Sequence, residues 1–454
     1  ADGPAVGAAV KAAAPRPRRR WWHPRPEPAR RGDAQWGDVA AYMYTSGTTG
    51  FPKAAKVAHV RCWAAATACS TLCRLRTGDA VYNPLPLFHA TGGLLGVWGS
   101  IRARATLVLR RKFSARAFVA DAAQCDGCLY VGEVCRFVVD AAPPDAAPPA
   151  RRLRFAFGNG MPRDGTWDRF KALAGVDRVI EFYASTEGNV NIFNNLGRRD
   201  ACGVVPRALA AIYPVFVARL ASREGGGDAR PPLLRNEAGF LVPCAAGEAG
   251  ELLGRIDSGD PSRRFDGYTD AKASAAKVVG DVRRKGDEYF RSGDLVVADR
   301  EGFFYFVDRV GATFRWKGEN VATTQVQAAL LAGASADVAE AVVYGCRVPG
   351  KFSDLGRCGM AAIVLRPDAS PDWRTRLYAS LAASGLPAYA RPVFVRVVDA
   401  LPTTASHKYT TVALQTQGVE AGADDAVFVR DTVDATYREL DEARMAAVVA
   451  GESR

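Results

Sequence analysis

The sequence predicts an α/β protein: a large N-terminal domain of parallel sheets flanked by helices plus a small β subdomain, followed by a smaller, mobile α+β C-terminal domain. Three observations lead to this expectation. Apolar runs alternate with helical patterns from residue 39 to residue 183, as in a parallel sheet covered by helices. From about residue 205 the strands become shorter and bounded by turns, and beyond the stretch 308–320 the alternation returns on a smaller scale. We therefore expect a large domain over 37–310 and a small one over 311–454.

Each expected element follows from its local pattern. Short apolar runs, typical of buried strands, cover 39–44, 105–110, 128–131, 154–157 and 178–183. Helical patterns lie near 60–73, from Ser114, up to Asp140 and around 164–173. Turns are marked by Gly158-Asn159-Gly160 and by the proline-rich stretch 142–149. The β subdomain is expected to hold strands 213–220, 250–256 and 302–308, and the last domain strands 338–345, 359–365 and 391–398.

The formal charge of the 454-residue chain is +12, which raises the question of a nucleic-acid or membrane partner. Part of this excess lies in the Pro- and Arg-rich stretch 11–32, and we expect residues 1–36 to form a disordered tail. The remaining basic residues suit small anions such as nucleotides. Because they are not interleaved with aromatic residues outside Trp21 and Trp22, no nucleic-acid partner is expected.

The ten cysteines form no regular framework, which indicates reduced thiols in an intracellular compartment. Cys125 and Cys128 make a lone CxxC, and a zinc site would need a second pair at similar spacing. Cys62, Cys69 and Cys73 have helical spacing and are expected to face a core. The apolar run 90–101 is too short and too glycine-rich to span a bilayer, so no transmembrane helix is expected.

The stretch "YTSGTTGFPK", residues 44–53, has the composition of a phosphate-binding loop. Gly47 and Gly50 allow backbone amides to converge on an anion, three hydroxyl side chains add donors, and Lys53 adds a compact positive charge. The loop follows the strand 39–44, at the end of a strand where ligands of parallel sheets bind. A mobile hydroxyl-rich linker is the alternative, but it would need neither the lysine nor the strand. We therefore expect a polyphosphate ligand.

With this loop, the sequence resembles the adenylate-forming (AMP-binding) superfamily, which contains acyl-CoA synthetases, adenylation domains and luciferases. Further matches occur in the expected order over about residues 40–415: "PLFHATG" (86–92), "GNG" (158–160), "EFYASTEG" (181–188), "FRSGDL" (290–295), "VDRVGATFRWKGENV" (307–321) and "LPTTASHKYT" (401–410). The stretches "RRFDGY" (263–268), "FRWKGENVATT" (314–324) and "LPAYARP" (386–392) resemble the fatty acid transport protein and very-long-chain acyl-CoA synthetase branch.

The resemblance implies ATP-dependent activation of a long- or very-long-chain fatty acid to its acyl-CoA through an acyl-adenylate. ATP (released as AMP), Mg²⁺ and coenzyme A are the implied cofactors and co-substrates. It implies nucleotide contacts from Thr45, Ser46, Gly47, Thr48, Thr49, Gly50, Lys53, Gly158, Asn159, Gly160, Tyr183, Ala184, Ser185, Asp294 and Arg309. Lys408, Glu187, Thr186 and His89 would be catalytic, with Glu187 as the magnesium ligand.

Within this set, Tyr183 would stack on adenine opposite the 158–160 turn, and Asp294 and Arg309 would contact the ribose. Taken singly, these residues have simpler explanations: a surface charge for Asp294 or Arg309, a helix cap for Thr186-Glu187, a packed loop histidine for His89 and a solvated lysine for Lys408. The ordered series of motifs favours the functional interpretation.

The resemblance also implies that the small domain rotates about Asp308 to Gly311 between the two half-reactions. The chain departs from close relatives at Ser406-His407, at Ala312, and at Gln325 and Gln327, where relatives carry Ser-Gly and acidic residues. We expect these departures to affect how the closed conformations of the small domain are stabilised, and not the residues that perform the chemistry.

Relatives carry a folded segment and a membrane anchor before the phosphate loop, so we expect this chain to be N-terminally truncated. The branch implies an intracellular, membrane-associated protein of the endoplasmic reticulum, plasma membrane or peroxisome, with peripheral membrane association and a coupling to fatty acid uptake. Two alternatives stay open: a CoA ligase for another carboxylate, and a catalytically inactive fragment that binds nucleotide or lipid.

Overall fold

The structure, a computed structural model, describes residues 34–45, 53–143, 146–209, 213–221, 231–260, 263–310, 312–317, 319–348, 350, 355–403, 409–420, 422 and 425–450. The chain divides into two compact units. Unit 1 comprises residues 1–161, 166–199 and 256–276, and unit 2 comprises residues 162–165, 200–255 and 277–454.

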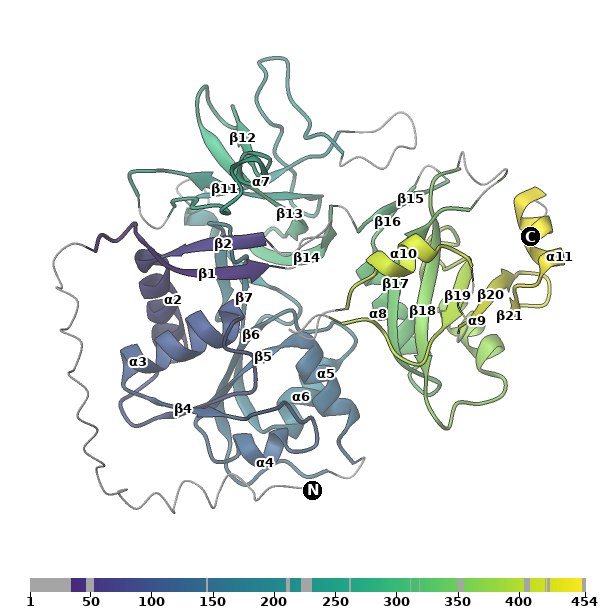
Figure 1. The fold of residues 1–454 in the computed structure, drawn as a ribbon, viewed down its shortest axis with the longest axis horizontal. Helices are drawn as coiled ribbons and strands as arrows, with labels where there is room; N and C mark the ends of the chain where they lie inside the picture. The colour runs from purple at the N-terminus through teal and green to yellow at the C-terminus, as the bar shows by residue number, and fades with distance from the viewer. Residues whose placement is uncertain are drawn as a thin grey trace, which may run out of the picture. The chain divides into compact units, whose positions relative to one another are not determined.

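Unit 1 is built on a mainly parallel sheet with strand order β8-β7-β6-β5-β3-β4, in which only β8 runs antiparallel to its neighbour (Figure 1). Its inner strands are continuous apolar runs because both faces of a parallel sheet are covered, and every residue of β5 is buried. The strands are β3 (Ala80–Asn83), β4 (Thr106–Leu109), β5 (Gly127–Val131), β6 (Leu153–Asn159), β7 (Val176–Ala184) and β8 (Asn191–Asn194).

The helices of unit 1 follow the expected alternation. Helices α5 and α6 pack against each other, and their apolar faces join the core formed with β5, β6 and β7. The helix expected from Ser114 begins later, at Phe118, because residues 115–117 form a turn in which the Ser114 hydroxyl accepts a hydrogen bond from the Ala117 amide at 3.4 Å. The helices are α3 (Gly99–Ala103), α4 (Phe118–Ala122), α5 (Gly132–Asp140), α6 (Thr166–Leu173) and α7 (Ala271–Ala275), with a π-helix over Thr91–Trp98.

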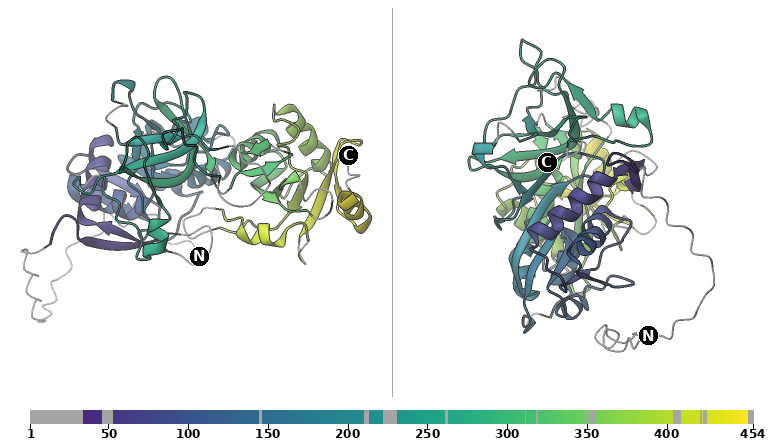
Figure 2. Two further views of the ribbon diagram at one scale, coloured as in Figure 1. Left: turned by 90° about the horizontal axis from the view of Figure 1, so that it is seen from above. Right: turned by 90° about the vertical axis from the view of Figure 1, so that its left-hand side faces the viewer.

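The strand that precedes the predicted phosphate loop is not part of the parallel sheet, which corrects the expectation from the sequence. Among the described residues, strand β1 (Val39–Thr45) pairs with β2 (Lys53–Ala58) alone, antiparallel, so the loop joins two strands of a hairpin. Helix α2 (His59–Leu72) continues directly from β2 and lies beside the hairpin (Figure 2). A small core centred on Val57, Cys62 and Leu94 fills the space between them.

The first part of unit 2 is antiparallel, as predicted for the β subdomain. Its strand order is β10-β11-β13-β14-β9, and β12 adds to β13. A compact apolar core includes Phe216, Leu253 and Tyr289. The strands are β9 (Gly203–Val204), β10 (Val215–Ala218), β11 (Ala249–Ile256), β12 (Val278–Gly280), β13 (Glu288–Ala298) and β14 (Phe303–Arg309), with a short 3₁₀ turn at Arg207–Leu209.

The C-terminal part of unit 2 is an α+β fold around the sheet β17-β18-β19-β20-β21, in which only β18 and β19 are parallel. Helices α8 and α9 pack against each other beside this sheet (Figure 1). Its elements are β15 (Phe314–Trp316), β16 (Glu319–Val321), α8 (Thr323–Gly333), β17 (Val338–Cys346), β18 (Cys358–Leu365), α9 (Trp373–Ala383), β19 (Phe394–Val397), α10 (Val412–Gln417), β20 (Ala426–Asp431), β21 (Thr436–Glu439) and α11 (Glu442–Ala450). The predicted α/β class with its β subdomain and α+β C-terminal part is confirmed.

All the cysteines except Cys244 are buried. Cys62, Cys69 and Cys73 are buried on or just after α2, as expected, and Cys125 and Cys128 are buried with free thiols. Within the described ranges, no three His, Cys, Asp or Glu side chains gather in a way that could hold a metal ion. None of the helices in those ranges is both long enough and apolar enough to cross a bilayer.

Candidate functional site

The β1–β2 hairpin brings the two ends of the predicted phosphate loop together. Thr45 and Lys53 are direct partners across the hairpin, and the Thr45 hydroxyl donates to the Lys53 carbonyl at 3.4 Å. Residues 46–50, which carry the other predicted loop contacts, lie outside the described residues. The described ends of the loop therefore place one hydroxyl and one ammonium group at the same end of a hairpin.

The "RRFDGY" stretch lies along the free edge of β2. The Lys56 amide donates to the Gly267 carbonyl at 2.9 Å, and the Thr269 amide donates to the Ala54 carbonyl at 3.0 Å. The Lys53 ammonium lies 5.8 Å from the centre of the buried Tyr268 ring, within the range of a cation–π interaction. This stretch, which the sequence marked only as a branch signature, thus supports the lysine-bearing strand.

A buried carboxylate joins the two predicted sides of the adenine site. Glu181 on β7 accepts hydrogen bonds from the amides of Gly160 and Met161, at 3.1 and 2.9 Å, and from the Tyr130 hydroxyl at 2.7 Å. Burial, followed by the charge of Glu181, raises the pKa of the Tyr130 phenol well above its ordinary value, so this phenol stays protonated and donates. Glu181 therefore fixes the 158–160 turn relative to the strand that carries Tyr183.

Two glycines allow this turn to form: Gly160 within it, and Gly132 at the start of the neighbouring helix α5. Gly160 has φ of +77°, a conformation that other residues adopt only with strain. Gly132, at the start of α5, lies so close that a Cβ atom there would be 1.6 Å from the Gly160 carbonyl oxygen. The turn can approach α5 only because position 132 has no side chain.

The segment after β7 carries the predicted magnesium ligand. Ala184, Ser185, Thr186 and Glu187 are half-buried, and the Ser185 hydroxyl accepts a hydrogen bond from the Gly188 amide at 3.1 Å. From α2, the Arg61 guanidinium donates to the carbonyls of Ser185 and Gly188, at 3.0 Å in the first case. Because α2 continues from the lysine-bearing strand, the two predicted phosphate-contacting segments of unit 1 are connected through Arg61.

The two predicted ribose contacts lie together in unit 2. Asp294 on β13 and Arg309 on β14 are direct partners across the strands, and Arg309 Nε is 3.7 Å from Asp294 Oδ1. The Asp294 side chain is largely buried, whereas Arg309 is exposed. A carboxylate held at a strand pair in this way can accept two hydroxyl hydrogen bonds.

His89 precedes the π-helix Thr91–Trp98. Its ring Nδ1 accepts from the Thr91 amide at 3.4 Å, and its carbonyl accepts from the Gly93 amide at 2.7 Å. Single turns of π-helix occur frequently at functional sites. Lys408 lies outside the described residues, as does Gly311 of the predicted hinge.

Sequence reasoning missed three residues that organise the site: Arg61, Glu181 and Asp266. Glu181 and Asp266 stand inside motifs that the sequence singled out, so their motif position was an available signal. Arg61 carried no local signal, because it is one basic residue in a helix of mixed composition.

Two family models match the chain. One, described as AMP-binding enzyme, covers residues 3–222, and the other, AMP-binding enzyme C-terminal domain, covers residues 329–408. Among curated proteins, the long-chain fatty acid transport protein 1 of Mus musculus is 40% identical over 420 residues, which is 91% of this chain and 62% of that protein. A medium/long-chain-fatty-acid–CoA ligase of Mycobacterium tuberculosis is 40% identical over 423 residues, 91% of this chain and 66% of that protein.

Solved structures share the fold at lower identity. An ATP-bound MatB from Rhodopseudomonas palustris superposes with a TM-score of 0.66 at 22% identity, covering 85% of this chain and 69% of that one. An o-succinylbenzoate coenzyme A synthetase from Bacillus subtilis, solved with ATP and a magnesium ion, gives a TM-score of 0.62 at 23% identity, with coverage of 85% and 70%. The chain spans 62% of the length of the fatty acid transport protein 1 sequences that it matches.

Proposed function

Since this chain belongs to the AMP-binding enzyme superfamily, we propose that it activates long- or very-long-chain fatty acids to acyl-CoA at the expense of ATP. In the first step a carboxylate oxygen attacks the α-phosphorus of ATP and pyrophosphate leaves. In the second, the deprotonated thiol of coenzyme A attacks the acyl carbonyl carbon and AMP leaves. The similarity to fatty acid transport proteins and to a fatty-acid–CoA ligase supports the substrate class.

One observation carries the proposal: Arg61 connects the lysine-bearing end of the phosphate loop to the turn that holds Thr186 and Glu187. The first step must bring an anion to an already anionic phosphorus, so fixed cations and hydrogen-bond donors are needed where negative charge gathers. Lys53 supplies the charge for the outer phosphates, and Thr186 a hydroxyl for the α-phosphate. In unit 2, Asp294 and Arg309 would hold the ribose.

Magnesium fits this donor set. The ion binds few protein carboxylates and takes its remaining ligands from phosphate oxygens and water. A single carboxylate, Glu187, on a turn held by Arg61 meets that requirement without a multi-carboxylate cluster. When bound, Mg²⁺ would neutralise phosphate charge. The chain's own task is to keep Glu187 and Thr186 in place and to exclude water from the reacting groups.

We test the proposal by measuring pyrophosphate release from purified protein with ATP and acids of graded chain length. Release that requires both ATP and a long-chain acid supports the proposal. If aromatic or sterol side-chain acids are preferred, the substrate class is wrong. If the protein binds ATP but forms no acyl-AMP with any acid, the alternative of a catalytically inactive nucleotide-binding protein is correct.

Lys408→Ala is the corresponding variant prediction. This lysine is expected to contact both the attacking carboxylate and the α-phosphate, so its loss should lower the rate of pyrophosphate release by roughly a hundredfold or more. The control is Lys285→Ala, which removes an 88% exposed lysine paired with Asp281 and should leave the rate unchanged. Undiminished release in the Lys408 variant would contradict the mechanism.

A further inference from the structure

Arg61, on the helix that follows the phosphate-loop hairpin, interacts with two other motifs: the 185–188 turn and the "RRFDGY" stretch. Its guanidinium Nη2 donates to two main-chain carbonyls more than a hundred residues away, those of Ser185 and Gly188. Those carbonyls lie on either side of Thr186 and Glu187. Because one side chain holds both ends of this short turn, it limits the conformations open to the two residues between them.

The charges around Arg61 favour the same arrangement. Burial lowers the pKa of Arg61, while the charges of the Asp266 and then the Glu187 carboxylate act in the opposite direction, so two anionic groups from different segments favour the ionised guanidinium. The Asp266 side chain is only 7% exposed and also pairs with Arg264 at 2.7 Å. An arginine is suited to such a position because its guanidinium stays ionised and offers five donors.

The third motif is "RRFDGY", which contains Asp266. Gly267 of this stretch and Thr269, the residue that follows it, support the lysine-bearing strand. The Arg263 carbonyl accepts from the Asn189 side chain at 2.9 Å, just beyond the turn. Arg61 therefore links the helix that follows the loop hairpin to the 185–188 turn by hydrogen bonds, and its charge interacts with that of Asp266 in this stretch.

We propose that Arg61 is a positioning residue for magnesium-bound ATP, holding the 185–188 turn so that Glu187 presents its carboxylate to the metal. This inference rests on the proposed function above. In this proposal Arg61 acts through the backbone of the turn, by its hydrogen bonds to the Ser185 and Gly188 carbonyls. A simple charge effect predicts the opposite result, because removing a positive charge beside Glu187 would strengthen cation binding.

The first experiment measures nucleotide affinity by titration calorimetry in Arg61→Met and Arg61→Ala. The methionine variant keeps the apolar stem of the side chain and removes only the donors and the charge, so it also guards against a folding defect. We expect binding of ATP with Mg²⁺ to weaken about tenfold or more, as for other residues that orient metal ligands, with AMP affinity unchanged. Unchanged or tighter binding of ATP with Mg²⁺ would overturn the proposal, and so would an equal loss for AMP.

A double substitution tests whether Arg61 acts through Glu187. In the Glu187→Gln background, the added Arg61→Met change should cost little further affinity for ATP with Mg²⁺, because two residues that act as a unit give non-additive effects. A full additive loss would show that Arg61 acts elsewhere. Arg102→Ala is the matched control, since Arg102 is an exposed arginine that also contacts α2, through Thr67 at 3.1 Å.

Hydrogen exchange supplies a readout that needs no nucleotide. Amides of residues 185–190 should exchange faster in Arg61→Met than in the parent protein or in Arg102→Ala, while those of β5 and β6 stay protected. Exchange that does not change would overturn the proposal even if the enzyme is active. If the parent protein fails to bind ATP, the proposed function fails, but this exchange comparison still decides whether Arg61 holds the turn.

Discussion

Glu181 shows how a single buried carboxylate can hold together the two sides of the predicted nucleotide site. It receives two main-chain amides of the 158–160 region and one phenol, so each of its oxygens accepts at least one hydrogen bond. A buried charge is tolerated only when its hydrogen bonds are satisfied. Glu181 therefore fixes the position of the 158–160 turn relative to strand β7.

We expect Glu181→Gln to weaken AMP binding and to lower the melting temperature. The glutamine amide group would direct N–H donors at an amide N–H of the turn, leaving a buried donor unsatisfied at a cost of about 1–3 kcal/mol. Calorimetric titration with AMP and thermal unfolding measure the two effects.

The matched control is Tyr130→Phe, which removes one donor to Glu181 and leaves both amide bonds to the turn. It should reduce stability while affecting AMP affinity less than Glu181→Gln does. Equal losses of AMP affinity in the two variants would mean that Glu181 does not act through the turn.

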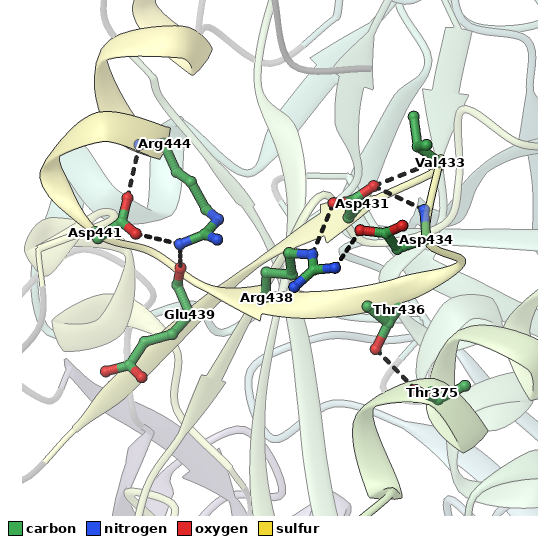
Figure 3. Close-up of polar contacts among 9 residues, drawn as sticks. All are labelled: Thr375, Asp431, Val433, Asp434, Thr436, Arg438, Glu439, Asp441 and Arg444. Carbon is green, nitrogen blue, oxygen red and sulfur yellow. Dashed lines mark hydrogen bonds and ion pairs between the residues drawn. The ribbon is translucent and has the colours of Figure 1, made fainter.

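At the scale of elements, the hairpin β20–β21 illustrates how a turn is closed by one acidic side chain (Figure 3). Asp431 accepts from the amides of Val433 and Asp434 at 2.9 and 3.1 Å, and from Arg438 Nε at 3.0 Å. Arg438 also pairs with Asp434, and Thr436 bonds to Thr375 of α9 at 3.0 Å. Polar contacts thus close the turn of the hairpin and attach the hairpin to a helix.

Asp431→Ala should destabilise the protein by roughly 1 kcal/mol at neutral pH. Hydrogen bonds, first that from the Asp434 amide, lower the pKa of Asp431. The contribution of the ionised carboxylate to the free energy of unfolding is therefore complete above the unfolded pKa of about 3.9, and it is lost as the pH falls through the folded pKa. The difference in melting temperature between parent and variant should therefore begin to shrink below about pH 4 and vanish once the pH is below the lowered folded value. Asp368→Asn, at an exposed turn, is the control; a difference that persists in acid would refute the role of the ionised carboxylate.

At the scale of the whole molecule, Asp308 marks where β14 connects to the C-terminal fold. Its buried carboxylate accepts from the amide and hydroxyl of Thr323, the first residue of α8, at 2.6 and 2.9 Å. Burial raises the pKa of Asp308, and these hydrogen bonds oppose the rise. The helix is thus held to the end of β14, so the rotation that we predict about Asp308 to Gly311 would have to break these two hydrogen bonds.

Asp308→Ala should loosen the start of α8. Loss of a carboxylate that satisfies helix N-terminal donors costs about 0.5–2 kcal/mol of stability. Amides of residues 319–326 should therefore exchange faster with solvent. Trypsin should also cleave sooner after Arg315 or Lys317. Thr323→Val removes only the hydroxyl bond and should give a smaller change. Unaltered exchange and cleavage in Asp308→Ala would show that another contact holds the helix.

Local patterns predicted much of the fold but not all of its pairings. The bounds of α2 and the apolar runs of β5, β6 and β7 lie within a few residues of expectation, because burial on both faces produces continuous apolar stretches. The pairing of β1 with β2 was not predicted, because an isolated apolar run does not specify its partner strand. The site residues taken from the resemblance stay predictions, and the structure shows how several are held: Lys53 beside Tyr268, and Asp294 opposite Arg309.

The sequence by itself determined the family and the order of its motifs, and it is the source of the proposed chemistry, because these depend on residue types at close spacing along the chain. Only the tertiary structure decided which groups hold the motifs in place. Arg61 and its two carbonyl partners are 124 and 127 residues apart, and Glu181 and Tyr130 are 51 apart. No local propensity encodes such pairs, since they form only when the packing of strands and helices brings donor and acceptor within hydrogen-bonding distance.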